Sequence, residues 1–495
     1  MMPLSVFSVS LLSENLLLLC SVLVFAAVLV TKLGSRWGVP SLLLFLLLGM
    51  AVGPDGLGLH FEDYEVAESI GHFAMTIILF TAGLETSMEE TRPVYRTGIL
   101  LSSLGVFITV VLTGLFIWLV GRVSLGLSLM GSFLLAAVMG STDSASVFSV
   151  LRDKRLHLRQ NLGPMLELES GSNDPMAYTL TIIMVKLMTT EGIADKSGWL
   201  VGLSTVLVLV LQIVVGIAIG LGAGYAGKWV LNRVKLSSFA LTSILMLSMG
   251  LFANGVASVL HGNGLLALYL AAIIIGNKAQ LQQRKDILNF FDGLTWLMQL
   301  VMFLLLGLLA RPSHMLPVLL PALLIGLFLL MVARPAGVFA SMAPFKKKFT
   351  TRAKLLTSWV GLKGAGPILF ALCPVVAGVE RSSEMFNIVF LITLFSLLVQ
   401  GGSLGRVAKW LDLSYDADPK AESFGMEIPE AMGMLRDHTV TEDDLAGGAT
   451  LRDLQLPHGI RVMMVHRGGR FLVPHGSMPL QVGDRLVIIM GDSDD

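Results

Sequence analysis

Long apolar segments separated by short polar loops constrain this 495-residue chain more than any other feature. Thirteen segments follow one another, at about 15–32, 39–55, 66–85, 97–120, 127–150, 163–188, 198–225, 237–259, 263–277, 288–310, 315–343, 354–378 and 385–408. Many have the roughly 20 residues that an α-helix needs to cross a hydrocarbon core. With 54% hydrophobic and 14% charged residues, the composition excludes an ordinary soluble domain. We therefore expect a polytopic α-helical membrane protein of about 13 transmembrane helices.

The basic residues of the loops predict the orientation of these spans. An odd number of spans places the termini on opposite sides, and cytoplasmic loops are enriched in Lys and Arg. If the N-terminus lies outside, the inner side carries 21 basic residues and the outer side four. The inner residues are Lys32, Arg36, Arg92, Arg96, Arg152, Lys154, Arg155, Arg159, Lys228, Arg233, Lys235, Lys278, Arg284, Lys285, Lys346, Lys347, Lys348, Arg352, Lys354, Arg406 and Lys409. The outer residues are Arg122, Lys196, Arg311 and Arg381. We therefore expect an outer N-terminus and a cytoplasmic C-terminus.

The chain becomes polar after the last apolar segment. Short runs with strand-like alternation occur at 461–466, 470–473 and 484–490, and turn-forming residues separate them. We expect a transmembrane domain over 1–412, a polar linker over 413–422, and a small cytoplasmic α+β domain over 423–495.

Five ionisable residues lie inside the apolar segments, where charges are costly and usually functional. Asp174 lies eleven residues into the sixth segment, which at helical rise is roughly 16 Å, close to the middle of the membrane. Glu169 precedes it by more than one turn. Similar counts place Asp143, Arg334 and Lys363 at about the same depth. We expect these five side chains to converge on one layer.

The sixth segment presents a polar helical face at this depth. Glu169, Ser170, Asn173 and Asp174 share that face because residues four apart lie above one another on a helix. Pro175 has no backbone N–H, so it leaves a carbonyl oxygen without its helical partner beside the carboxylates.

Two other segments contain runs that interrupt a helix. Gly140-Ser141-Thr142-Asp143-Ser144 consists of residues that start helices, and it lies in the middle of the fifth segment. The twelfth segment has a matching interruption over 361–367, around Lys363. Broken helices at corresponding positions of two inverted halves indicate the midplane site of a transporter. We expect spans one to six and eight to thirteen to be inverted repeats.

The charged residues of this layer have more than one interpretation. Asp143 and Lys363 would either bind a cation or, as we favour, neutralise the dipole ends of half-helices. Arg334 would pair with Glu169 or with Glu85 at the inner end of the third segment. Glu169 itself would bind the ion or only hold Arg334.

Together these motifs resemble the monovalent cation:proton antiporters of the NhaP type, especially their potassium/proton branch with a C-terminal TrkA-C-like domain. The resemblance covers nearly the whole chain through 140–143, 169–174, 333–335 and 358–365, and through 451–454 and 483–486 in the tail. At Lys363 the family usually has Arg. A point charge is retained there, but not the bidentate geometry of a guanidinium.

The resemblance implies an antiporter that exchanges a monovalent cation for H⁺. We favour K⁺, with Na⁺ or Li⁺ as the alternative, and a cation channel as a remote one because no repeated pore loop is present. Asp174 would bind the cation or the proton, with Thr142 and Ser170 as further cation ligands and Glu169 acting through water. Asn173 would make the exchange electroneutral, since electrogenic relatives carry Asp at that position.

The resemblance also implies a homodimer in the bacterial inner membrane that serves pH and volume homeostasis by alternating access. We expect no cofactor beyond the transported ions, and leave open a regulatory nucleotide or other small molecule at the C-terminal domain. A net charge of zero gives no reason to expect nucleic-acid binding. We expect no enzyme activity, because the chain has neither an HExxH motif nor a visible nucleophile with a His partner.

Overall fold

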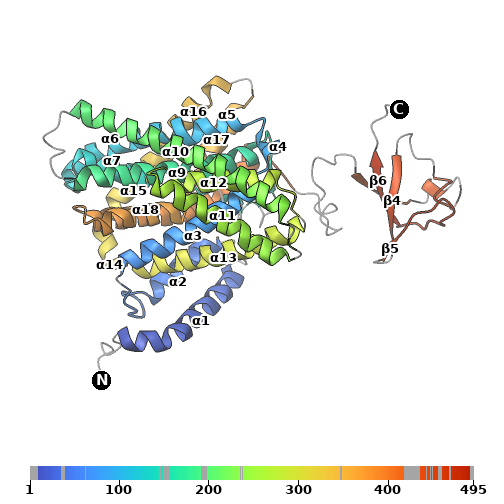
Figure 1. Ribbon diagram of the computed structural model, residues 1–495, viewed down its shortest axis with the longest axis horizontal. Helices are drawn as coiled ribbons and strands as arrows, with labels where there is room; N and C mark the ends of the chain where they lie inside the picture. The colour runs from blue at the N-terminus through green and yellow to red at the C-terminus, as the bar shows by residue number, and fades with distance from the viewer. Residues whose placement is uncertain are drawn as a thin grey trace. The chain divides into compact units, whose positions relative to one another are not determined.

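The computed structural model divides the chain into two compact units (Figure 1). These are the helical unit, Met1–Tyr415, and the C-terminal unit, Asp416–Asp495. The structure describes residues 9–34, 40–61, 63–143, 146–148, 151, 156–190, 198–234, 236, 238–281, 283–345, 348–416, 435–441, 443–445, 448, 450–454, 460–467 and 470–490.

Helices of ten or more residues make up most of the helical unit. They are α1 (Val9–Gly34), α2 (Ser41–Val52), α3 (Tyr64–Glu85), α6 (Val106–Ser124), α7 (Leu129–Val138), α9 (Leu162–Thr189), α10 (Gly198–Arg233), α11 (Phe239–Val259), α12 (Gly264–Lys278), α13 (Arg284–Leu309), α15 (Leu319–Phe328), α18 (Ala365–Val376) and α19 (Ser382–Ser396). Shorter α-helices are α4 (Met88–Thr91), α5 (Tyr95–Leu100), α14 (Pro312–Met315), α16 (Arg334–Ser341), α17 (Thr351–Trp359) and α20 (Gly402–Trp410). Two short 3₁₀ turns are η4 (Leu316–Val318) and η6 (Ala343–Phe345).

Within the described residues, seven helices or continuous helix series are long and apolar enough to cross a membrane. Five shorter apolar helices accompany them. α9 is also long, at 28 residues, but the polar residues along it keep it out of the apolar set. The helical unit is therefore that of a multi-pass membrane protein.

Two of the predicted segments are interrupted in the structure. In the fifth, α7 ends at Val138 and residues 141–143 are not helical. In the twelfth, α17 ends at Trp359 and α18 begins only at Ala365. These interruptions are called the first and second breaks below.

Three further helices contain a π-helical turn. They are η3 (Leu101–Gly105) between α5 and α6, η5 (Leu329–Ala333) between α15 and α16, and η7 (Leu397–Gly401) between α19 and α20. Such turns widen a helix locally and occur often near functional sites.

Glycines allow close packing around α12, which contacts α3, α10 and α11 (Figure 1). Gly216, Gly220 and Gly224 recur every four residues on the side of α10 that faces α12. A Cβ at Gly220 would lie 2.7 Å from the carbonyl oxygen of Ala267, so a larger residue would push the helices apart. Small residues at this spacing are typical of helix pairs in membranes.

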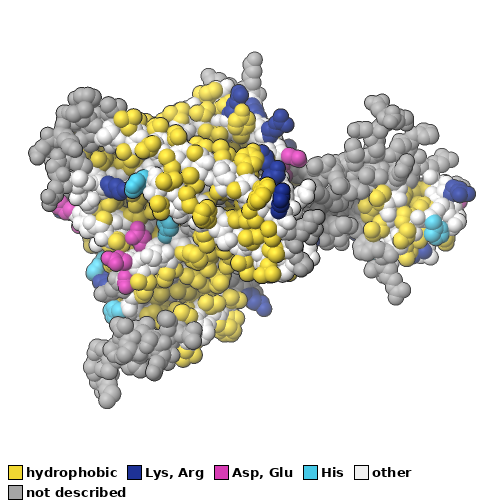
Figure 2. Space-filling view, viewed as in Figure 1, with side chains coloured by type: hydrophobic (Ala, Val, Ile, Leu, Met, Phe, Trp, Pro, Cys, Tyr) yellow, Lys and Arg dark blue, Asp and Glu magenta, His cyan; other side chains and the backbone are white. Residues whose placement is uncertain are grey.

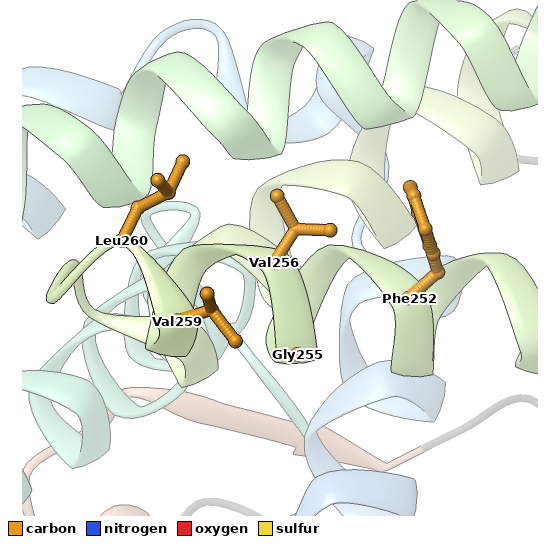
Figure 3. A pocket seen from close by; sticks show the side chains of 5 residues that line it. All are labelled: Phe252, Gly255, Val256, Val259 and Leu260. Carbon is orange, nitrogen blue, oxygen red and sulfur yellow. The ribbon is translucent and has the colours of Figure 1, made fainter.

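The surface of the helical unit is largely apolar. Figure 2 shows hydrophobic side chains over most of the visible face, with many of the visible Lys and Arg near one end. Only 11% of the apolar stretch of α10 and 22% of that of α11 are buried, as expected for lipid-facing helices. A shallow hollow on α11 is lined by Phe252, Gly255, Val256, Val259 and Leu260 (Figure 3), and none of these residues is polar.

The described part of the C-terminal unit forms one antiparallel sheet with strand order β3-β6-β4-β5. The strands are β3 (Leu435–Thr439), β4 (Ile460–Arg467), β5 (Arg470–Leu472) and β6 (Arg485–Met490). Its small core includes Val440, Val465, Leu480 and Leu486. Besides strands, the described residues of the C-terminal unit contain a 3₁₀ turn, η10 (Asp443–Leu445), and no α-helix. The α+β expectation is therefore corrected to a β domain for this part of the chain.

The first residues of the predicted linker belong to the helical unit. Strand β2 (Ser414–Asp416) pairs with β1 (Leu156–Leu158), and the N–H of Arg159 donates to the carbonyl of Leu413, 2.9 Å away. Leu413 is buried, which explains why the chain stays attached up to this point. Residues 417–434, with the rest of the predicted linker, lie outside the described residues.

Candidate functional site

The two breaks meet, and main-chain contacts hold them together. The N–H of Asp143 in the first break donates to the carbonyl of Leu362 in the second, at 2.9 Å. The ammonium of Lys363 donates to the carbonyls of Met139, at 2.6 Å, and Ser141, at 2.7 Å. These oxygens follow the carboxyl end of α7, where a helix dipole concentrates negative partial charge. The buried Lys363 cation therefore lies where that charge is stabilised.

Asp143 occupies the complementary position. Its carboxylate accepts hydrogen bonds from the backbone N–H of Ser146, at 3.1 Å, and from the Ser146 hydroxyl, at 2.5 Å. It also lies directly against Gly364, where a Cβ would overlap the carboxylate. Since Gly364 immediately precedes α18, glycine here lets a negative charge approach a helix amino end.

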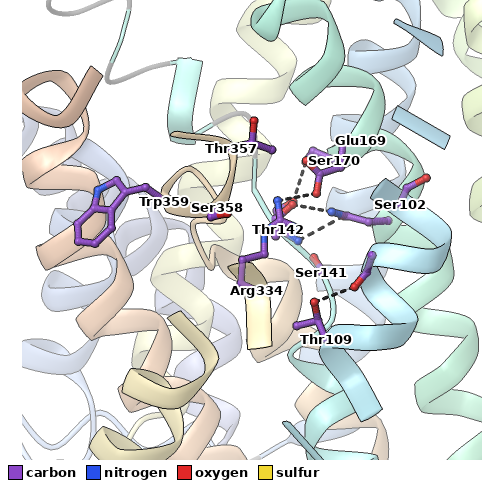
Figure 4. A network of polar contacts seen from close by, with 12 residues as sticks. Ser102, Thr109, Ser141, Thr142, Glu169, Ser170, Arg334, Thr357, Ser358 and Trp359 are labelled. Carbon is purple, nitrogen blue, oxygen red and sulfur yellow. Dashed lines mark hydrogen bonds and ion pairs between the residues drawn. The ribbon is translucent and has the colours of Figure 1, made fainter. Parts of the chain in front are cut away.

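The first break also makes four hydrogen bonds with α9. Figure 4 labels Thr142 and Ser170, which form one of them. The Ser141 hydroxyl donates to Oδ1 of Asp174. The Ser170 hydroxyl donates to the carbonyl of Thr142, at 2.7 Å. Asn173 Nδ2 donates to Oγ1 of Thr142, at 2.5 Å, and the N–H of Thr142 donates to Oδ1 of Asn173, at 3.3 Å. The polar face of α9 thus replaces the helical partners that the backbone loses at the break.

Accessibility differs among the polar residues of α9. Glu169 is 1% exposed and Asn173 0%, whereas Asp174 is only partly buried. Gly366 of α18 and Met75 of α3 lie beside Asp174. A Cβ at Gly366 would lie 3.9 Å from its Oδ1 and 4.0 Å from Cε of Met75. Asp174 is therefore the carboxylate of this face that an ion or a proton can reach most easily.

Arg334 pairs with Glu169, not with Glu85. Its Nη2 lies 2.6 Å from Oε1 of Glu169, and the two side chains are 7% and 1% exposed. The guanidinium packs over Gly361 in the second break, where a Cβ would lie 2.7 Å from Nε. Glu85 is exposed at the end of α3. Of the two partners that the sequence allowed for Arg334, the structure selects Glu169.

The residues matched by family models agree with this architecture. Residues 20–410 match the transmembrane sodium/hydrogen exchanger model, and residues 435–494 match the TrkA-C domain model. The chain belongs to the sodium/hydrogen exchanger family. This exchanger family is one of transporters and not of enzymes.

Individual relatives of the exchanger support the same placement. This chain is 36% identical to "K(+)/H(+) antiporter NhaP2" of Shewanella oneidensis, over 96% of its own length and 81% of the relative. It is also 36% identical to "K(+)/H(+) antiporter NhaP" of Alkalimonas amylolytica, over 96% of this chain and 80% of the relative. Its fold is similar to that of the sodium proton antiporter MjNhaP1 from Methanocaldococcus jannaschii, with a TM-score of 0.69 and 21% identity, covering 80% of this chain and 99% of that one. The predicted resemblance to NhaP-type antiporters is confirmed.

Three residues of the exchanger's site were not singled out from the sequence. Ser141 bonds Asp174, the hydroxyl of Ser396 accepts the N–H of Lys363 at 2.9 Å, and the buried ring of Tyr269 packs on Gly171. Ser141 lies inside the recognised run 140–143, which is the signal that could have found it. For Ser396 and Tyr269 the sequence offers no comparable signal, because their contacts depend on how distant helices pack.

Proposed function

We propose that this exchanger moves K⁺ and H⁺ in opposite directions across the bacterial inner membrane, without net movement of charge. The relatives that it matches at 36% identity over 96% of its length are named K⁺/H⁺ antiporters. The sodium proton antiporter with a similar fold is only 21% identical. This difference favours K⁺ over Na⁺ or Li⁺ as the exchanged cation.

The observation that carries the proposal is the position of Asp174. It is a partly buried carboxylate beside a helix break, and a neutral hydroxyl, Ser141, is its hydrogen-bond donor. One carboxylate can hold one proton or one monovalent cation at a time. Competition between the two for Asp174 would therefore couple their movements.

Oxygen atoms around the first break would supply the remaining cation ligands. A hydroxyl has two acceptor lone pairs besides its proton, so Ser141, Thr142 and Ser170 can each bind a cation after a small rotation. Thr142 and Ser170 are the ligands that we expected from the sequence, and Ser141 is added by its contact with Asp174. These hydroxyl ligands are neutral, so the single charge of Asp174 balances one monovalent cation.

The neighbouring residues would keep the exchange electroneutral. Glu169 is held by Arg334 at 2.6 Å, so we assign it to the ion pair and not to the transported ion. Asn173 is neutral, and both its amide oxygen and its amide nitrogen form hydrogen bonds with Thr142. Asp143 and Lys363 contact main-chain groups beside the half-helix ends, which supports a dipole-neutralising role.

We further propose thirteen spans with two inverted repeats, in which span four corresponds to span eleven. The π-turns η3 and η5 would then be equivalent, and so would the residues four positions beyond them. A Cβ at Gly337 would lie 2.6 Å from the carbonyl oxygen of Gly105. Thr109 Oγ1 lies 3.4 Å from the carbonyl of Ala333. In this alignment Gly105 corresponds to Ala333, and Thr109 corresponds to Gly337. The contact of Gly337 with Gly105 is therefore the counterpart of the contact of Thr109 with Ala333, as a two-fold axis requires.

The breaks support the same relationship. In the first half, the N–H of Thr142 donates to the side chain of Asn173 in the following span, at 3.3 Å. In the second half, the N–H of Lys363 donates to the side chain of Ser396 in the following span, at 2.9 Å. Each half therefore uses a side chain of its last span to bind the backbone of its broken helix.

Orientation and assembly complete the proposal. We place the N-terminus outside and the C-terminus in the cytoplasm, from the distribution of basic residues. Eight of those basic residues lie outside the described residues, namely Arg36, Arg152, Lys154, Arg155, Lys196, Lys235, Lys346 and Lys347. By resemblance, we propose a homodimer in which spans five, six, twelve and thirteen move as a unit. The TrkA-C domain would regulate exchange in response to a small molecule such as a nucleotide.

Ion-driven proton movement in inverted membrane vesicles tests the function. Adding K⁺ should collapse a pre-formed pH gradient in vesicles with the parent chain, and Asp174→Asn should abolish this response. Asp286→Asn, at the exposed start of α13, is the matched control and should exchange normally. Continued exchange by Asp174→Asn would refute the assignment of the site. A response to Na⁺ or Li⁺ but not to K⁺ would refute the choice of cation, and cation flux without counter-movement of protons would indicate a channel.

A further inference from the structure

A cluster of rings lies one helical turn beyond Asp174, on helices that the proposed site uses only in part. The ring of Tyr178 lies between two others, with its centroid 5.4 Å from that of His72 and 5.5 Å from that of Phe370. Tyr178 is on α9, His72 on α3 and Phe370 on α18. Both separations fall in the range of attractive ring pairs. Three helices therefore meet at this layer through their rings.

The rings lie on the outer side of the site by helical spacing. Tyr178 follows Asp174 by four residues, so it shares the face of Asp174 and lies about 6 Å closer to the end of α9 at Thr189. On α18, Phe370 follows Gly366 by four residues, and on α3, His72 precedes Met75 by three. Asp174, Gly366 and Met75 are neighbours at the site. All three helices thus place a ring one turn further toward the proposed outer surface.

A second layer lies one more turn outward. Cys373 follows Phe370 on α18, and Glu68 precedes His72 on α3. The Glu68 carboxylate lies near enough to interact electrostatically with Cys373, Tyr178 and His72. Glu68 is partly exposed, whereas Cys373 is 5% exposed. A carboxylate therefore stands at the outer side of the rings, where it would attract a cation.

The rings of this layer are packed against one another, with Phe370 buried and His72 and Tyr178 half-buried. Phe370 is 1% exposed, and its neighbour Leu369 is 2% exposed and packs directly on Gly71 of α3. Glycine at 71 removes the side chain that would otherwise hold α3 and α18 apart. Tyr178 lies between His72 and Phe370 and joins the three helices at this layer.

We propose that the outward path of the cation to Asp174 runs between α3, α9 and α18, and that the rings of His72, Tyr178 and Phe370 close it. This inference rests on the proposed function, because it takes Asp174 as the exchanged site. When the path opens, the rings separate and the row Glu68, His72 and Tyr178 lines it with a carboxylate, an imidazole and a hydroxyl. These groups suit a hydrated monovalent cation that loses its water stepwise before it reaches Asp174.

The chain provides its own reporter for this opening. It has two cysteines, of which Cys20 is exposed on α1 and Cys373 is buried beyond the rings. In a Cys20→Ser protein, Cys373 is the one remaining thiol. A membrane-impermeant maleimide applied to intact cells tests access to this thiol from outside, and the same reagent applied to inverted vesicles tests access from inside.

We expect slow labelling of Cys373 in intact cells, because this buried thiol is uncovered only when α3 and α18 move apart, which the ring contacts oppose. Tyr178→Ala should accelerate it roughly tenfold, because both ring contacts of the layer are lost. Tyr178→Phe keeps the ring and should label as the parent does. Tyr225→Ala removes an exposed tyrosine ring of α10 and is the matched control without effect. Phe370→Leu, a milder change that preserves most of the volume, should accelerate labelling less than Tyr178→Ala.

Equal labelling rates in Tyr178→Ala, Phe370→Leu and Tyr178→Phe would overturn the inference. So would labelling of Cys373 from inverted vesicles but not from intact cells. K⁺/H⁺ exchange is measured in parallel on the Cys20→Ser protein. Exchange without accelerated labelling refutes the path alone, and accelerated labelling without exchange refutes the proposed function alone.

Discussion

Arg334 and Glu169 form a buried ion pair, with Nη2 of the arginine 2.6 Å from Oε1 of the glutamate. The pair joins α16, which follows the π-turn η5, to α9, which carries Asp174. Its members come from different proposed repeats. Through Gly361 the same guanidinium also contacts the second break. One ion pair thus holds three parts of the site in position.

Removing one member of this pair should destabilise the protein strongly. Arg334→Met leaves the Glu169 carboxylate, and Glu169→Gln leaves the Arg334 guanidinium, as a buried charge without its partner. We expect each variant to lose about 3 to 5 kcal/mol of stability. The double variant Arg334→Met with Glu169→Met should recover much of this loss, because it leaves no buried charge. Thermal unfolding in detergent measures both effects. Equal stability of single and parent proteins would show that the ion pair is not structural.

The hydroxyl of Ser141 should contribute to cation affinity. Ser141→Ala removes the hydrogen bond to Asp174, and a charge-assisted bond of this kind is worth roughly the free energy of a tenfold change in affinity. We expect an increase of about that size in the K⁺ concentration for half-maximal exchange, with the maximal rate less affected. Ser132→Ala is the control, since this buried hydroxyl of α7 donates to the carbonyl of Ser128 in its own helix turn. An unchanged K⁺ dependence would remove Ser141 from the ligand set.

Introducing a second carboxylate at position 173 should make exchange sensitive to voltage. Asn173→Asp keeps the oxygen that accepts the N–H of Thr142 but loses the amide donor and adds a titratable charge. If one net charge then moves per cycle, a membrane potential of 100 mV adds about 2.3 kcal/mol of driving force. Exchange in proteoliposomes should respond to an imposed K⁺-independent potential in the variant and not in the parent. A voltage response of the parent would contradict the electroneutral assignment.

A methyl group at position 171 should be poorly tolerated. A Cβ there would lie 2.6 Å from Cε2 of Tyr269, a fully buried ring that cannot move aside freely. We expect Gly171→Ala to cost about 1 to 3 kcal/mol, as overpacking of a core does. Tyr269→Leu should partly restore stability in the double variant. Gly222→Ala on α10, where nothing lies within 4 Å of the added carbon, should leave the unfolding temperature unchanged.

The C-terminal unit should lose stability in acid through Asp484. Hydrogen bonds from Arg467, at 2.8 and 2.5 Å, hold the pKa of the Asp484 carboxyl below its usual 3.8. Because the folded pKa is depressed, this stabilisation is complete above the unfolded pKa of about 3.9 and is lost as the pH falls through the folded value. Hydrogen exchange of β6 in the full-length chain should therefore accelerate below about pH 4. Asp484→Asn should exchange faster at neutral pH and show a weaker acid dependence.

The positions of the helices and breaks could be predicted because the membrane makes them local properties. A backbone in hydrocarbon satisfies its hydrogen bonds within its own segment, so apolar length marks a helix. A run such as Gly140 to Asp143 disrupts that pattern wherever it occurs. The strand-like alternation of the tail likewise predicted β4, β5 and β6, but not β3. The helical content expected there does not appear among the described residues, because short polar stretches carry no comparable signal.

Spacing along α9 also placed Glu169, Ser170, Asn173 and Asp174 on one face before any partner was known. What spacing left undecided was the role of each residue. Only the folded chain shows that Glu169 is taken up by Arg334 while Asp174 remains partly exposed beside Ser141. The choice between Glu169 and Glu85 depended on the depth and rotation of two helices whose residues are far apart in the sequence.

The sequence by itself determined that this protein is a multi-pass helical membrane protein and where two of its helices break, and it predicts which polar residues lie at mid-depth. These follow from hydrophobicity and helical period, which act over a few turns of one segment. The tertiary structure decided the pairings: Lys363 with the carbonyls beyond α7, Arg334 with Glu169, Ser141 with Asp174, and Tyr178 with two rings of neighbouring helices. The reason is that each pairing depends on how separate helices pack, and packing is a property of the assembled bundle and not of any one segment.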